Sequence, residues 1–184
     1  MAFVQKCIPD AYHASIFDIP YDDLKKQGVK ALFFDLDNTV IGYHQDELGQ
    51  KEMQFIQKLA KKFKILILSN SSQKRVSHAL RMTSFDYIWH AYKPTSIGFK
   101  KGLKIVGLRK GDVVMIGDQL MTDIYGAKRF GIKAFLVGSV KRSSDRKLTQ
   151  MNRKIEAWVL KKIEKKYPKV YQERLYDYVQ DHAL

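Results

Sequence analysis

The sequence predicts an α/β protein in which a five-stranded parallel sheet is flanked by helices. Short apolar runs alternate with stretches whose apolar residues recur at helical spacing, and this alternation repeats five times along the 184 residues. Several apolar runs end abruptly in polar residues, as strands do at the carboxyl edge of a parallel sheet, where ligands bind. Such strands are joined by right-handed crossovers. We therefore expect one sheet with helices on both faces.

The strands are expected where apolar residues run without interruption. Four apolar residues, Ala31–Phe34, precede Asp35 and suit a strand that is buried on both faces, as central parallel strands are. The run before Ser69 has the same form, whereas the run at Tyr87–Trp89 is weaker. The expected strands span residues 29–35, 64–70, 87–89, 112–118 and 133–137.

The helices are expected from apolar spacing and from residues that start or end a helix. Hydroxyl side chains that can cap a helix stand at two expected starts, Ser71 or Ser72 and Thr95 or Ser96. Glycines stand at three expected ends, Gly28, Gly107 and Gly131. The expected helices span residues 20–27, 50–62, 72–82, 95–107 and part of the stretch between 118 and 131.

The last part of the chain is expected to be a basic helical extension of about residues 145–184, added to a core of about residues 20–140. An apolar stripe runs along its first helix: Leu148, Met151, Ile155, Trp158, Val159 and Ile163. Residues 141–170 contain eleven Lys or Arg and three Asp or Glu. Such a helix either lies on an anionic membrane surface or packs its stripe on the core with its lysines in water.

Length and composition predict a single domain of residues 1–184 with one hydrophobic core. The one cysteine, Cys7, excludes an intrachain disulfide and fits a reducing compartment. The N-terminus has no apolar stretch typical of a signal peptide, and no segment is long and apolar enough to span a bilayer. We expect a cytoplasmic protein, or one peripheral at the inner face of the membrane. The net charge of +14 favours nucleic acid, anionic lipid or phosphorylated substrates.

Polar residues at the ends of the expected strands are the candidates for chemistry. Asp35 and Asp37 follow the first strand only one residue apart. Two carboxylates this close repel each other, so the pair is costly unless a cation lies nearby or one member carries a proton. Three further groups follow in order: Ser69 with Asn70, then Lys93, and then Gly117–Asp123 with its two aspartates, Asp118 and Asp123.

In their order and spacing, these groups closely resemble the four motifs of the haloacid dehalogenase (HAD) superfamily. The resemblance implies a Rossmann-like HAD fold. The segments Cys7–Asp10 and Asn152–Glu156 look like the YqeG family within subfamily IIIA. That family is similar to the phosphatidylglycerophosphate phosphatases of mitochondria and plastids.

Phosphoryl transfer needs an in-line nucleophile, a metal ion and positive charge around the transferring group. The resemblance assigns Asp35 as the nucleophile that forms an aspartyl-phosphate. Asp37 then protonates the leaving oxygen and later takes a proton from water. The acid at this position favours a phosphatase over a dehalogenase or a phosphonatase.

The remaining candidates fit metal and phosphate. Hard oxygens from Asp35, the main-chain carbonyl of Asp37 and Asp118 suit Mg²⁺, with Asp123 supporting a metal-bound water. The groups expected to contact the phosphate are Thr39, Ser69, Asn70 and Lys93. Taken singly, these residues also have ordinary structural explanations, such as Ser69 as a helix cap and Lys93 as a surface lysine.

The intervals between the motifs leave no room for a cap domain. Residues 40–68 and 71–92 are mostly consumed by expected helices and strands, so the site should be open to large phosphorylated substrates. We therefore expect phosphatidylglycerophosphate or another surface-presented phosphate as the substrate. One alternative is a soluble phosphomonoester or phosphoprotein. Another is a non-catalytic protein that binds RNA or ribosomes through phosphate contacts.

Overall fold

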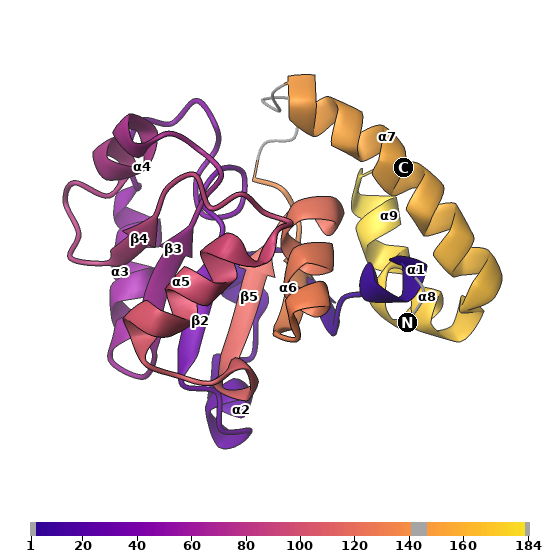
Figure 1. Ribbon diagram of the computed structural model, residues 1–184, viewed down its shortest axis with the longest axis horizontal. Helices are drawn as coiled ribbons and strands as arrows, with labels where there is room; N and C mark the ends of the chain where they lie inside the picture. Colours follow the sequence, from indigo (N-terminus) through magenta and orange to yellow (C-terminus); the bar gives the residue numbers. More distant parts are fainter. Residues whose placement is uncertain (1–2, 141–146, 183–184) are drawn as a thin grey trace.

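A six-stranded parallel sheet forms the centre of the protein in the computed structural model, which describes residues 3–140 and 147–182 (Figure 1). The strands lie in the order β1-β6-β5-β2-β3-β4. Their bounds are β1 Ala11–His13, β2 Ala31–Phe34, β3 Lys64–Leu68, β4 Asp86–Ile88, β5 Val113–Gly117 and β6 Lys133–Val137. The parallel α/β class that the sequence predicts is thus confirmed.

The expectation of five strands was wrong, because the structure adds β1 at one edge of the sheet. This strand pairs in parallel with β6, and Ala11 lies opposite Phe135. All three of its residues are only partly buried, since a neighbouring strand covers one side alone. A half-exposed strand of three residues leaves no apolar run in the sequence, and backbone pairing with β6 defines it instead.

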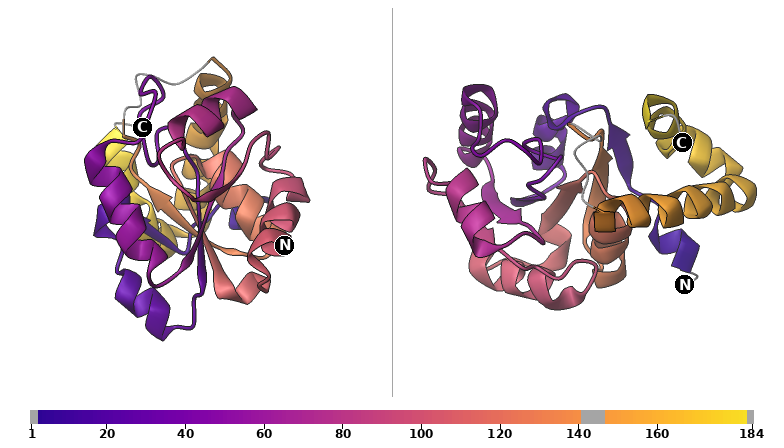
Figure 2. Two further views of the ribbon diagram at one scale, coloured as in Figure 1. Left: turned by 90° about the vertical axis from the view of Figure 1, so that its left-hand side faces the viewer. Right: turned by 90° about the horizontal axis from the view of Figure 1, so that it is seen from above.

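Helices cover both faces of the sheet, as Figure 2 shows from two further directions. One face packs against α2 (Tyr21–Lys26), α3 (Gln50–Ala60), α4 (Gln73–Ala79) and the 3₁₀ turn Ile16–Asp18. The other face packs against α5 (Ser96–Val106), α6 (Tyr125–Phe130), and side chains from the N-terminal and C-terminal segments. Because the central strands are buried on both sides, their residues read as unbroken apolar runs.

The helix ends follow the expected residues with one difference. The Thr95 hydroxyl accepts a hydrogen bond from the Ile97 amide, and the Ser72 hydroxyl accepts one from the Arg75 amide. Gly107 and Gly131 end α5 and α6 in the left-handed conformation, with φ of 64° and 91°. Ser71, the other candidate cap, instead directs its hydroxyl to the candidate active site.

The C-terminal extension consists of α7 (Lys147–Lys166), α8 (Pro168–Arg174) and α9 (Tyr176–His182), beside α1 (Phe3–Lys6) and α6 in Figure 1. The expected apolar stripe of α7 is divided. Val159 and Ile163 are fully buried, whereas Ile155 and Trp158 are 43% and 53% exposed. The side chains of Leu148 and Met151 lie outside the described residues.

Among the described residues, no helix is both long enough and apolar enough to cross a membrane.

Candidate active site

The predicted site residues gather at the carboxyl ends of the central strands. Asp35 directly follows β2 and Asp118 directly follows β5, and these two strands are neighbours in the sheet. The chain runs outward from β2 to β3 and β4 on one side, and from β5 to β6 on the other. The strand order therefore reverses between β2 and β5, which is where open α/β sheets bind ligands.

Lys93 connects two of the carboxylates. Its Nζ atom lies 2.6 Å from Asp35 Oδ1 and 2.6 Å from Asp123 Oδ1, and its side chain is only 2% exposed. Asn70, the second residue after β3, fixes the Lys93 backbone through both ends of its amide: Nδ2 donates to the Lys93 carbonyl and Oδ1 accepts from the Lys93 amide. The segments after β3 and β4 are thereby joined at the site.

Asp123 comes from a π-helical turn, Leu120–Ile124, that precedes α6. The Asp123 side chain packs directly on Gly117, where an added Cβ would lie 2.4 Å from its Cγ atom. Asp123 Oδ2 also accepts a hydrogen bond of 3.1 Å from the Gln119 amide. Glycine at position 117 therefore lets a completely buried carboxylate reach Lys93.

Thr39 and Ser69 are both buried beside the carboxylates. The Thr39 hydroxyl lies 3.3 Å from Asp35 Oδ2 and 3.3 Å from Asp118 Oδ1, and it accepts a hydrogen bond from the Asp118 amide. Ser69 Oγ accepts a hydrogen bond of 3.0 Å from the Ser71 amide. The structure thus places both hydroxyls at the site, and their contact with a phosphate stays a prediction.

Asp37 is held by two residues whose roles the sequence did not reveal. Ser71 Oγ donates to Asp37 Oδ2 over 2.6 Å, and Arg75 approaches Asp37 Oδ1 with Nε at 3.0 Å and Nη2 at 2.9 Å. Arg75 lies on α4, so its guanidinium meets Asp37 only when the loop after β2 folds against that helix. No local pattern marks this pairing, although a basic residue in the first turns of α4 is visible in the sequence.

The buried site carries more negative than positive charge. Burial raises the pKa of Asp35 to about 7, although Lys93 acts in the opposite direction. Burial likewise raises the pKa of Asp123. Burial alone would lower the pKa of Lys93, but Asp123 and Asp35 outweigh that effect and raise it. One lysine does not neutralise several buried carboxylates, so the site favours an additional cation.

The donor set fits a hard divalent cation. Asp35, Asp118 and Asp123 are all buried, and one carboxylate oxygen from each lies within 4.8 Å of the others. Carboxylate oxygens are the ligands that Mg²⁺ and similar ions prefer. The Asp37 carboxylate is not among these three, and the role of its main-chain carbonyl as a metal ligand stays a prediction.

Residues 40–92 form no additional folded unit over the site. Residues 40–92 are described without a gap, and their regular elements are α3, β3, α4 and β4, all of which belong to the sheet or its helical layer. The absence of a cap between the first three motifs, which the interval lengths predicted, is thus observed in this part of the chain.

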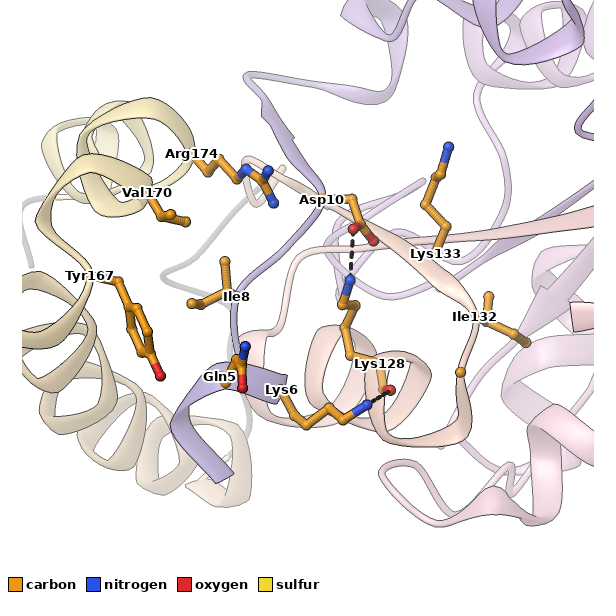
Figure 3. A pocket seen from close by; sticks show the side chains of 11 residues that line it. Gln5, Lys6, Ile8, Asp10, Lys128, Ile132, Lys133, Tyr167, Val170 and Arg174 are labelled. Carbon is orange, nitrogen blue, oxygen red and sulfur yellow. Dashed lines mark hydrogen bonds and ion pairs between the residues drawn. The ribbon is translucent and has the colours of Figure 1, made fainter. Parts of the chain in front are cut away.

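A pocket of about 530 Å³ lies near the amino ends of β1 and β6, whereas the candidate active site lies at the carboxyl ends of the strands (Figure 3). Its lining includes Asp10, just before β1, and Lys133, the first residue of β6. Lys128 Nζ lies 2.6 Å from Asp10 Oδ1, and Lys6 donates to the Lys128 carbonyl. These contacts join the N-terminal segment to α6. None of the predicted site residues lines this pocket, so it is separate from the candidate active site.

Two family models and several known proteins match this chain. The family model described as mitochondrial PGP phosphatase matches residues 1–84, and one described as HAD-hydrolase-like matches residues 90–165. The chain is 32% identical over 160 residues to "Probable phosphatase YqeG" of Bacillus subtilis (strain 168), covering 86% of this chain and 92% of that protein. It is 33% identical over 76 residues to the glyceraldehyde 3-phosphate phosphatase of Pyrococcus furiosus, covering 37% and 32%.

One similar solved structure is a HAD superfamily (subfamily III A) hydrolase from Legionella pneumophila. It shares 16% identity, with 76% of this chain and 91% of that chain covered and a TM-score of 0.45.

The parallel sheet, the strand-end aspartates, the HAD-hydrolase-like family model and the match to the Bacillus subtilis protein define the protein as a phosphatase of the HAD superfamily. Within that superfamily, the chain belongs to the YqeG family, because it is 32% identical to a YqeG protein over nearly the whole of both chains.

Proposed function

We propose that this phosphatase transfers the phosphoryl group of a phosphomonoester to Asp35. An Asp35 carboxylate oxygen attacks phosphorus, the bond to the leaving oxygen breaks, and Asp37 gives that oxygen a proton. Water then attacks the phosphorus of the aspartyl-phosphate and loses its proton to Asp37, which releases inorganic phosphate and restores Asp35. The 2.6 Å contact between Asp35 and Lys93 is the main support, since it sets a cation beside the proposed nucleophile.

Other residues of the site would bind and orient the phosphoryl group. Lys93 would neutralise both the nucleophile and a phosphoryl oxygen as charge develops. Thr39, Ser69 and Asn70 carry hydroxyl or amide groups at the same edge and would donate to the remaining oxygens. The fixed positions of Ser69 and Asn70, which hydrogen bonds to Ser71 and Lys93 maintain, support this role.

Mg²⁺ is the proposed cofactor. Asp35, Asp118 and the main-chain carbonyl of Asp37 would hold the ion, and Asp123 would orient a water bound to it. When bound, Mg²⁺ would offset the negative charge of the carboxylates and of the transferring group. The buried acidic cluster, which one lysine leaves electrically uncompensated, supports this proposal.

Phosphatidylglycerophosphate is the proposed substrate. The PGP phosphatase model matches residues 1–84, a range that includes both Asp35 and Ser69. Residues 40–92 form no cap over the site, which suits a phosphate presented on a large surface such as a membrane. The net charge of +14 suits an anionic membrane. Cytoplasmic location with peripheral contact at the inner face of the membrane belongs to the same proposal.

We also propose that residues 1–184 form one hydrolase domain. Val159 and Ile163 of α7 belong to the same buried cluster as Ala134 and Leu136 of β6, which supports one continuous core.

Phosphate release from phosphatidylglycerophosphate in lipid vesicles with Mg²⁺ tests the function. We expect turnover that chelation with EDTA abolishes and that Asp35→Asn lacks. A soluble phosphomonoester is the second candidate, which the partial match to a glyceraldehyde 3-phosphate phosphatase supports. Turnover of soluble phosphomonoesters with none of the lipid would reject phosphatidylglycerophosphate and favour that candidate.

A further inference from the structure

Three aromatic side chains stand in a row immediately before Lys93. Trp89, His90 and Tyr92, which we call the aromatic ledge, follow β4 at the carboxyl edge of the sheet. Their ring centroids are separated by 5.1 Å between Trp89 and His90 and by 6.1 Å between His90 and Tyr92. Trp89 is 41% exposed and Tyr92 is 58% exposed. The exposed rings therefore form one small continuous aromatic surface rather than scattered single side chains.

The backbone holds the ledge firmly against the candidate active site. The His90 amide donates to the Ser71 carbonyl, and the Ala91 amide donates to the Ser69 carbonyl. His90 and Tyr92 both have a positive φ, 43° and 55°, which is rare for residues with large side chains. Between them, Ala91 is fully buried. The buried alanine anchors the segment while the aromatic rings on either side of it remain in solvent.

Asp35 is recessed, whereas the Trp89 and Tyr92 side chains of the ledge are exposed. The Asp35 side chain is only 7% exposed, so a lipid phosphate reaches it only if the carboxyl edge of the sheet faces the bilayer closely. In that orientation the exposed groups of this edge enter the headgroup layer first. Tyrosine and tryptophan rings are suited to that layer, because each has an apolar body and a polar tip.

We propose that the aromatic ledge docks on an anionic phospholipid bilayer and thereby brings the phosphate to Asp35. The inference rests on the proposed lipid substrate and adds the surface by which the enzyme would meet it. The chain outside residues 141–170 still carries a net charge of +6, which would attract it to an anionic bilayer, and the ledge would set its orientation there.

The C-terminal helix α7 presents a competing surface. Trp158 is 53% exposed there, and Lys162 Nζ lies 5.6 Å from its ring centroid. The two surfaces are well separated, because the ledge follows β4 at one edge of the sheet while the extension packs near β1 at the other edge. Figure 1 shows β4 and α7 on opposite sides of the molecule. Since the chain has two tryptophans, each surface carries its own fluorescent reporter.

Single-tryptophan variants decide between the surfaces. Trp158→Phe leaves Trp89 as the reporter, and Trp89→Phe leaves Trp158. With vesicles of phosphatidylglycerol and phosphatidylcholine that contain no substrate, we expect a blue shift of Trp89 emission and quenching by lipids with brominated acyl chains. The Trp158 emission should not change, and pure phosphatidylcholine vesicles should have no effect. A response of Trp158 alone would move the docking surface to α7, and no response of either would overturn the proposal.

Kinetics give a second test that separates docking from the choice of substrate. In Trp89→Ala/Tyr92→Ala, we expect kcat/KM on vesicle-presented phosphatidylglycerophosphate to fall about tenfold more than kcat/KM on p-nitrophenyl phosphate, because two interfacial rings are lost. Equal loss on both substrates would reject a docking role. If Trp89 inserts into vesicles but the lipid is not hydrolysed by the unsubstituted protein, the proposed substrate fails while docking stands.

Discussion

Lys93 Nζ stands between two buried carboxylates, 2.6 Å from Asp35 Oδ1 and 2.6 Å from Asp123 Oδ1. The ammonium group joins the end of β2 to the turn after β5, although the three residues are far apart in sequence. It therefore has a structural function, which is to pair Asp123, as well as the proposed function of assisting Asp35. A buried charge left without its partner is strongly destabilising.

Lys93→Met should reduce both activity and stability. Loss of the cation should lower kcat by about a thousandfold, because charge on the phosphoryl group is no longer offset. It should also lower the free energy of unfolding by about 3 kcal/mol in EDTA, because Asp35 and Asp123 lose their shared partner. Urea denaturation and steady-state kinetics measure the two effects. Adding Asp123→Asn should recover part of the stability without the activity, and a stable, active Lys93→Met protein would contradict this account.

Asp35→Asn should change how stability depends on pH. The pKa of Asp35 is raised to about 7 in the folded protein without metal, mainly by burial, from an ordinary value near 4. Between these two pH values the folded state binds the proton more tightly than the unfolded state does, so stability contributed by the protonated group is lost as pH rises. Asparagine has no such proton. In EDTA, the free energy of unfolding of Asp35→Asn relative to the unsubstituted protein should therefore increase by about 2 kcal/mol between pH 5 and pH 8.

The control for this experiment is Asp112→Asn, which removes an aspartate at the surface. Lys30, 3.1 Å away, lowers the pKa of Asp112 below its ordinary value near 4, so Asp112 is ionised in both the folded and the unfolded state from pH 5 to pH 8, and its substitution should leave the difference in free energy of unfolding flat over that range. A flat difference between Asp35→Asn and the unsubstituted protein across the pH range would show that Asp35 is ionised throughout.

The central strands could be predicted because a strand that is buried on both faces is apolar at consecutive positions. The runs that form β2 and β5 are apolar at every position, and the residues that follow them are the candidate site residues. The edge strand β1 has no such apolar run, since only β6 pairs with it and its residues are only partly buried. In α7 the spacing indicated the helix but not which side chains are buried. Glu156 is buried against the Tyr178 hydroxyl, while Trp158 faces solvent.

The site was predictable where a residue follows its own strand and not where it depends on packing between elements. Asp35, Ser69 and Asp118 each directly follow a strand, so their convergence follows from the parallel sheet alone. Arg75 reaches Asp37 from a helix that follows another strand, and this contact depends on the path of the loop after β2.

Arg75→Met should impair the proposed acid without removing it. Arg75 holds Asp37 through two donors and is therefore a positioning residue. With Asp37 less firmly placed, kcat should fall by about a hundredfold on an alkyl phosphate, whose leaving oxygen needs a proton. The loss should be much smaller on p-nitrophenyl phosphate, whose leaving group departs without one. Steady-state kinetics on both substrates measure this difference.

Arg81→Met is the matched control, because Arg81 pairs with Glu47 at the surface near the same helix and does not contact Asp37. Equal losses on the two substrates in Arg75→Met would mean that Arg75 acts on something other than the leaving group.

Gly117→Ala should disturb the site through a single methyl group. The new Cβ would lie 2.4 Å from Asp123 Cγ, and the carboxylate cannot retreat without losing its bonds to Lys93 and to the Gln119 amide. Overpacking of this kind costs about 1–3 kcal/mol of the free energy of unfolding. The Mg²⁺-induced rise in Tm should also shrink, because Asp123 belongs to the acidic cluster. Gly111→Ala provides the control, since no atom lies within 4 Å of its added Cβ. If the two alanine variants melt alike with and without Mg²⁺, then Asp123 can move away from Gly117 freely. The glycine would then not be needed to place the Asp123 carboxylate.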